Sequence, residues 1–131
     1  MASIFTRIIN GEIPCHKLAE THDYLAFLDI MPLAKGHTLV IPKLEVDYIF
    51  DLEDNYFLGL WSFAKALAPA IKTAVPCNRI GVAVIGLEVP HAHIHLVPIN
   101  QVGDINFSRP KLHPTQQELA ETAEAIRKYC K

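Results

Sequence analysis

Three histidines alternate with apolar residues in the segment His91-Ala92-His93-Ile94-His95-Leu96-Val97-Pro98. Successive side chains of a β-strand point to opposite faces, so this pattern predicts a strand with all three imidazoles on one face. The apolar residues would then face a core. Because three of the seven histidines of the chain fall within five residues, the row indicates a site more strongly than a single histidine would.

Three interpretations of this row stay open from the residues alone. The first is a half-buried strand whose polar face happens to carry histidine. The second is a metal site, because imidazoles two residues apart on a strand can bind one ion, as in zinc enzymes with three protein ligands. The third is phosphoryl chemistry, in which one imidazole attacks phosphorus and its neighbours bind phosphate oxygens or move the proton of the leaving group.

The segment resembles the signature of the histidine triad family, in which three histidines alternate with apolar residues and a further apolar residue follows. Three other segments resemble the same family in the expected order. They are residues 4–14, residues 26–30 around Asp29, and residues 36–43, which begin with Gly36-His37. Together with the triad they cover most of residues 3–99.

The resemblance implies an α+β fold. Its parts are a five-stranded, mostly antiparallel sheet, one long helix, a short N-terminal helix and a C-terminal helix. A chain of 131 residues is expected to form one domain, here residues 1–131 with residues 101–131 as a C-terminal arm and helix. Family members pair as homodimers with a shared sheet, so a homodimer is expected.

Local patterns place the elements of this fold. Apolar spacing predicts a short helix over residues 3–10 with Ser3 as its N-cap, and a long helix from Asp51 or Glu53 to Ala74. Strands are expected over residues 16–20, 24–28, 38–41 and 79–85, the last covered on both faces. Thr115 and Glu118 form a capping-box pattern that opens a last helix ending near Tyr129.

The resemblance also implies a reaction. The expected activity is hydrolysis or nucleotidyl transfer at the α-phosphorus of a purine nucleotide phosphoramidate or ester. His93 would attack and form a nucleotidyl-histidine intermediate, which water then cleaves. The carbonyl of His91 would fix the ring of His93, His95 would donate to a phosphate oxygen, and His91 and His37 would lie near the leaving group.

The same family pattern implies a nucleotide pocket for an AMP-like ligand. Asp29 would accept hydrogen bonds from the ribose hydroxyls. The base would be lined by apolar residues, namely Ile4, Phe5, Ile8, Phe27 and Ile30. Many members bind zinc through Cys-x-x-Cys, but this chain has Ser3 and Thr6 at those positions, so no metal site and no cofactor are expected.

The link before the triad departs from the family pattern. Members usually carry an Asn and a longer Gly-rich stretch that ends in Gly-Gln-Ser or Gly-Gln-Thr, whose groups hold the phosphate. Here the link is shorter, with Leu87 in the Gln place and Glu88 in the Ser or Thr place. We place Glu88 in the nucleotide site, where its carboxylate would either repel a phosphate or orient an imidazole.

Two other functions therefore stay open beside the hydrolase. The altered link makes a nucleotide-binding regulatory module with little turnover a reasonable alternative, and enzymes that cleave dinucleoside polyphosphates share the triad. A metalloenzyme built on the histidine row is a weaker alternative, because no carboxylate or cysteine partner stands at an obvious spacing.

Composition narrows the class of partner. The net charge is −2 and no basic run exceeds two residues, which argues against binding of a nucleic-acid backbone. The three cysteines, Cys15, Cys77 and Cys130, are odd in number and far apart, so reduced thiols and a cytoplasmic location are expected. No signal-peptide pattern and no apolar run of about 18 residues is present, so no membrane association is expected.

Overall fold

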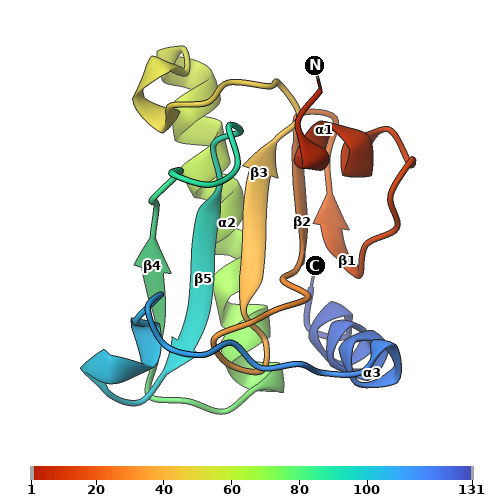
Figure 1. Cartoon of the computed structure of the whole chain (residues 1–131), viewed down its shortest axis with the longest axis vertical. Helices are drawn as coiled ribbons and strands as arrows, with labels where there is room; N and C mark the ends of the chain where they lie inside the picture. The colour runs from red at the N-terminus through yellow and green to blue at the C-terminus, as the bar shows by residue number, and fades with distance from the viewer. Residues whose placement is uncertain (1, 131) are drawn as a thin grey trace.

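The computed structural model describes residues 2–130 and contains one antiparallel sheet with the strand order β1-β2-β3-β5-β4 (Figure 1). The strands are β1 (Lys17–Glu20), β2 (Tyr24–Leu28), β3 (Thr38–Pro42), β4 (Arg79–Ala83) and β5 (Ile94–Ile99). The helices are α1 (Ile4–Ile9), α2 (Asp54–Ala74) and α3 (Gln116–Arg127), with short 3-10 turns η1 (Ile49–Asp51) and η2 (Val102–Ile105). The expected α+β class, five-stranded sheet and three helices are confirmed. No helix within residues 2–130 combines the length and the apolar character needed to cross a membrane.

The long helix α2 covers one face of the sheet, and the main core lies between them (Figure 1). Leu60, Ala64, Leu67 and Ile71 recur at spacings of three and four residues, and all four are buried. They pack against the inward-facing side chains of the central strands, which include Val40, Ile94 and Leu96. Because Ile94 and Leu96 point into this core, the histidines that alternate with them lie on the opposite face of the sheet.

That opposite face is covered only in part, by α1 and a smaller core. Ser3 caps α1, since its hydroxyl accepts a hydrogen bond from the amide of Thr6 at 3.0 Å. Phe5 of α1 packs onto a group of buried sheet residues, namely Leu25, Phe27, Leu39 and Ile41. The histidines lie on this half-covered face.

Two expectations about strands are wrong. The triad strand begins at Ile94, because the amide of Ala92 donates to the carbonyl of Val46 at 2.7 Å rather than to a neighbouring strand. His91 and His93 therefore precede β5. The strand from Arg79 ends at Ala83, and it is not covered on both faces, because the side chain of Val82 is 49% exposed. β4 is also the last strand at one edge of the sheet.

The helix ends differ from the expected ones by a few residues. α2 begins at Asp54, where the side chain of Glu53 accepts a hydrogen bond from the amide of Asn55, whereas Asp51 belongs to η1. The capping box of Thr115 and Glu118 is confirmed at the start of α3, which ends at Arg127.

Candidate active site

The sheet brings together four histidines from two distant segments. β3 and β5 are neighbours, and Leu39 is paired with His95. His37 stands two residues before Leu39, so it lies on the same face as His95. All four histidine side chains are buried, with at most 8% of the residue surface exposed. The expected meeting of His37 with the triad is thus a feature of the structure.

His93 is oriented by the backbone of His91. Its Nδ1 lies 2.7 Å from the carbonyl oxygen of His91, which can only accept, so Nδ1 carries the hydrogen. In a neutral ring Nε2 then holds the lone pair. Phe5 contacts the ring edge-on, with 5.0 Å between the ring centroids. The geometry leaves Nε2 of His93 as a candidate nucleophile.

His37 and His95 form a directed chain of hydrogen bonds. The amide of Leu33 donates to Nδ1 of His37 at 3.0 Å, so His37 carries its hydrogen on Nε2. That nitrogen lies 3.0 Å from Nδ1 of His95 and donates to it. The remaining hydrogen of His95 is therefore on Nε2, where it can be donated to an anionic oxygen.

Burial keeps both rings of this chain neutral. Desolvation, together with the smaller effects of the charges of His95 and Lys111, lowers the pKa of His37 to about 3. Desolvation, followed by the charge of His93, lowers the pKa of His95 to about 4. At neutral pH the pair therefore offers a hydrogen-bond donor without a positive charge.

His91 connects the triad to α1 through a group of polar side chains. Its Nε2 lies 2.8 Å from the carbonyl oxygen of Pro42 and must donate to it, so Nδ1 accepts from the hydroxyl of Ser3 at 2.8 Å. The carboxylate of Glu45 accepts from the amide of Ser3 and from the hydroxyl of Thr6. The hydroxyl groups of Ser3 and Thr6 thus hold α1 against the triad. Sequence reasoning missed Glu45, for which no local pattern was visible.

Asp29 lies beside the histidine chain. One of its oxygens accepts a hydrogen bond from the amide of Met31 at 2.9 Å, and the other lies 3.7 Å from Nε2 of His37. Burial raises the pKa of Asp29, although the Met31 amide and the charges of His93 and Lys111 oppose that rise. The carboxylate is 22% exposed, so it can still meet a ligand.

The apolar residues expected around the base fall into two groups. Phe5 and Phe27 are buried beside the triad, with 5.7 Å between their ring centroids. Ile4 and Ile30 are 49% and 58% exposed, and Ile8 is half-buried. The structure therefore brings the two phenylalanines together and leaves two isoleucines on the surface.

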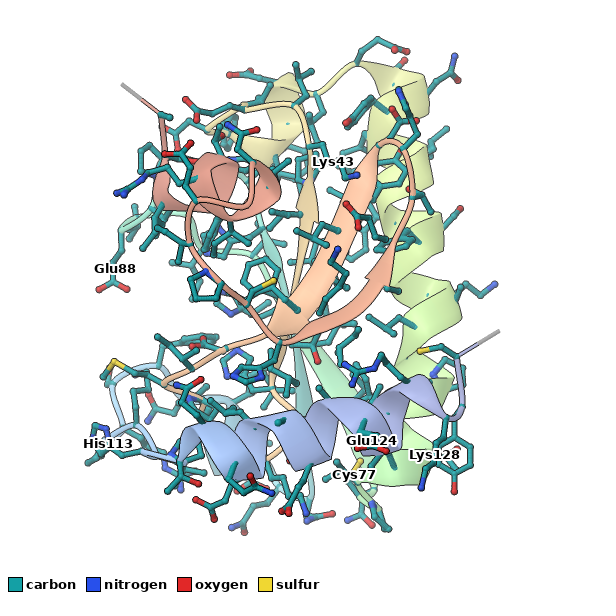
Figure 2. All side chains as sticks on the ribbon, turned by 90° about the vertical axis from the view of Figure 1, so that its right-hand side faces the viewer. Lys43, Cys77, Glu88, His113, Glu124 and Lys128 are labelled. Atoms are coloured by element: carbon teal, nitrogen blue, oxygen red, sulfur yellow. The ribbon has the colours of Figure 1, made fainter. Side chains whose placement is uncertain are left out.

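Glu88 is not brought into the histidine cluster. Its side chain projects outward from the molecule (Figure 2), and within residues 2–130 it joins no hydrogen bond or ion pair with an imidazole. Gly86, two residues earlier, has a φ of +73°, a conformation that favours glycine. In this structure Glu88 therefore does not orient a histidine.

The C-terminal arm, residues 101–114, adds two residues that sequence reasoning missed. The ring of Phe107 lies 4.6 Å from the ring of His95 and 6.1 Å from that of His37, measured between centroids. Lys111 lies over Phe107, with its ammonium 6.0 Å from the ring centroid. The arm contains no periodic pattern from which this contact could have been inferred.

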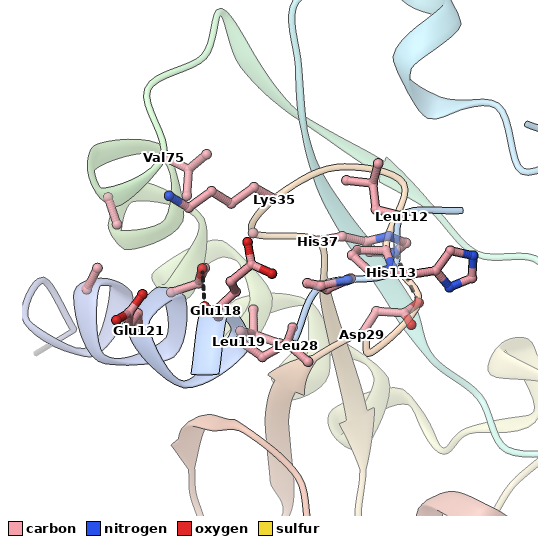
Figure 3. A pocket seen from close by; sticks show the side chains of 16 residues that line it. Leu28, Asp29, Lys35, His37, Val75, Leu112, His113, Glu118, Leu119 and Glu121 are labelled. Carbon is pink, nitrogen blue, oxygen red and sulfur yellow. Dashed lines mark hydrogen bonds and ion pairs between the residues drawn. The ribbon is translucent and has the colours of Figure 1, made fainter. Parts of the chain in front are cut away.

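A cavity of about 480 Å³ lies beside Asp29 and His37 (Figure 3). Asp29 and His37 form one part of its wall, and Lys35, Glu118 and Leu119 form another. None of the three triad histidines lines it. Of the residues placed in the candidate site, Asp29 and His37 line this cavity.

The residues that could hold a metal ion are Asp29, His37 and His95. Their ligand atoms lie within 4.8 Å of one another, and two imidazoles with a carboxylate suit a transition metal. An ion there would have to replace the hydrogen bond between His37 and His95, because both ring nitrogens already face each other. This set also omits His91 and His93, on which the metal interpretation of the histidine row depended.

Comparisons with known proteins agree with the geometry. The family model of the HIT domain matches residues 10–102. The adenosine 5'-monophosphoramidase HNT1 of Saccharomyces cerevisiae is 42% identical over 99 residues, which are 74% of this chain and 62% of that protein. The adenosine 5'-monophosphoramidase hnt1 of Schizosaccharomyces pombe is 35% identical over 130 residues and 96% of each chain. A crystal structure of a Hit-like protein from Bartonella henselae superposes with a TM-score of 0.83 at 31% identity, over 96% of this chain and 95% of that one.

Proposed function

The chain belongs to the HIT family, the family of the histidine triad, and from this premise we propose that it hydrolyses purine nucleotide phosphoramidates or esters at the α-phosphorus. One observation carries the proposal. The ring of His93 is held by the carbonyl of His91 so that Nε2 is its lone-pair nitrogen. The names of the two yeast relatives support a phosphoramidate of adenosine monophosphate as the substrate.

The proposed reaction has two displacements at phosphorus. In the first, Nε2 of His93 forms a bond to the α-phosphorus while the bond to the leaving amine or alcohol breaks, and the leaving group takes up a proton from solvent. In the second, water attacks the same phosphorus and loses a proton to solvent, the bond to His93 breaks and the nucleotide is released. A covalent intermediate divides one difficult displacement into two easier ones. The Nε2 hydrogen of His95 stabilises the phosphoryl oxygens as their charge grows.

The nucleoside part of the substrate is proposed to bind next to the histidines. The accessible oxygen of Asp29 accepts hydrogen bonds from the ribose hydroxyls. The buried rings of Phe5 and Phe27 form the floor of the base site, and the exposed side chains of Ile4 and Ile30 contact the base from the solvent side. Ile8 completes the apolar lining.

The test is a turnover assay on adenosine 5'-phosphoramidate with a chelator present. We expect release of AMP and ammonia at the same rate with and without chelator, and an enzyme mass raised by one adenylyl group after rapid quenching in alkaline denaturant, in which a bond between histidine and phosphorus survives. Binding of AMP without any turnover would contradict the proposal and favour a regulatory module. A rate abolished by the chelator would instead favour a metalloenzyme, and preference for a dinucleoside polyphosphate would favour that class of substrate.

We also propose that two copies of the chain pair through the open edge of β4. β4 is the last strand at one edge of the sheet, and an unpaired edge strand with apolar side chains is a template for pairing with another strand. Val82 of β4 is 49% exposed, and Ile85, two residues after the end of β4, is 46% exposed. We expect sedimentation equilibrium to give twice the chain mass, and the substitution Val82→Lys to shift it towards the mass of one chain. A wild-type protein that sediments as a single chain would contradict this pairing.

A further inference from the structure

The C-terminal arm carries a lysine that the proposed mechanism does not use. The arm runs from η2 to α3 across the strands on the face opposite α2 (Figure 1). Phe107 rests on His95, and the amide of Leu112 donates to the carbonyl of Pro32 at 2.9 Å. Lys111 lies between these two attachments, so its position is defined from both sides.

Backbone carbonyl groups hold the ammonium group of Lys111. Its Nζ donates to the carbonyl oxygen of Phe107 at 2.6 Å and to that of Arg109 at 3.2 Å. The guanidinium of Arg109 in turn donates to the carbonyl of Gly103 and lies 3.5 Å from a carboxylate oxygen of Asp104. These contacts link two parts of the arm to each other. The lysine side chain is thus half-buried and ordered by its own loop.

The positive charge of Lys111 is not neutralised by an ion pair. Within residues 2–130, no carboxylate oxygen lies within 4.0 Å of its Nζ, whereas Lys43 pairs with Glu20 at 2.7 Å. The charge acts on the site, because it contributes to lowering the pKa of both Asp29 and His37. An ammonium without a carboxylate partner, next to imidazoles kept neutral by burial, is suited to an anion.

We propose that Lys111 is a substrate-binding residue whose ammonium contacts an oxygen of the nucleotide's 5'-phosphate. This inference rests on the proposed function, because it assumes a nucleotide at the triad. It explains how a site in which burial keeps His37 and His95 neutral attracts an anionic group. It also explains how the shortened link can lack neutral phosphate donors, since a charge from the arm replaces them.

The experiment compares AMP with adenosine, two ligands that differ only in the phosphate. Binding is measured by calorimetry for the wild type, for Lys111→Met, which keeps the apolar stem, and for Lys111→Arg. We expect Lys111→Met to weaken AMP binding about 10- to 100-fold, the range of a charge-assisted hydrogen bond, and to change adenosine binding less than about twofold. Lys111→Arg should keep most of the affinity for AMP. Lys128→Met, on the exposed far end of α3 (Figure 2), is the matched control and should bind like the wild type.

Each other outcome has a definite meaning. Unchanged AMP binding in Lys111→Met, or an equal loss for AMP and adenosine, would overturn the role of Lys111 and leave the proposed function intact. A wild type that binds neither ligand would overturn both. A wild type that binds AMP through Lys111 but does not turn over the phosphoramidate would overturn the hydrolase and keep this inference.

Discussion

Replacing His93 with asparagine should lower kcat for adenosine 5'-phosphoramidate by about 10,000-fold or more, as expected when a covalent nucleophile is removed. Asparagine can still donate to the carbonyl of His91 but has no lone-pair nitrogen to attack phosphorus. The loss should therefore appear in kcat, while AMP still binds. The adenylylated enzyme should be absent from the quenched reaction.

The matched control for this variant is His22→Asn. His22 stands in the turn between β1 and β2 and its side chain is 98% exposed, so kcat should stay at the wild-type value. Turnover by His93→Asn within about tenfold of the wild type would exclude His93 as the nucleophile, because the loss of a covalent nucleophile lowers kcat far more than that. His91 would then have to be tested in its place.

Lowering the pH from about 7 to about 5 should reduce the free energy of unfolding strongly, at pH values where ordinary carboxylates are still ionised. Burial lowers the pKa of His37 to about 3 and of His95 to about 4, whereas both would titrate near 6.5 in the unfolded chain. Between these values the unfolded state binds more protons, so stability is full above about pH 6.5 and is lost as the pH falls. From about pH 7 to about pH 5, the free energy of unfolding should fall by roughly 4 kcal/mol for the two rings together.

Urea denaturation at several pH values measures this effect. In His37→Asn one of the two rings is removed, and the asparagine oxygen can still accept the hydrogen bond from the amide of Leu33. The change in unfolding free energy over the same pH interval should then be about half as large, because one proton fewer is involved. His22→Asn should keep the wild-type slope. A wild type whose stability is flat between about pH 7 and about pH 5 would mean that these rings are charged or accessible in the folded state.

The sequence by itself determined the class of fold, through its resemblance to the histidine triad family, and the places of its main elements. Alternation in residues 91–98 assigned histidine to one face and apolar residues to the other. The apolar periodicity before Ala74 identified the helix that buries the apolar face, with its start placed at Asp51 or Glu53 rather than at the observed Asp54. Ser3 and the pair Thr115 and Glu118 marked helix starts correctly, because capping uses side chains within three residues of one another. These features are local, so they can be recognised without knowing the tertiary structure.

Only the tertiary structure decided which residues surround the histidines and in which state the rings are held. Glu45, Phe107 and Lys111 reach the site from distant segments, and Glu88, although it is close to the triad in sequence, points away from it. The strand at His91 and His93 is interrupted by the hydrogen bond from Ala92 to Val46, which alternation could not reveal. Contacts between distant segments depend on how the whole chain packs. The neutral state of His37 and His95 likewise follows from desolvation, which exists only after the core has formed.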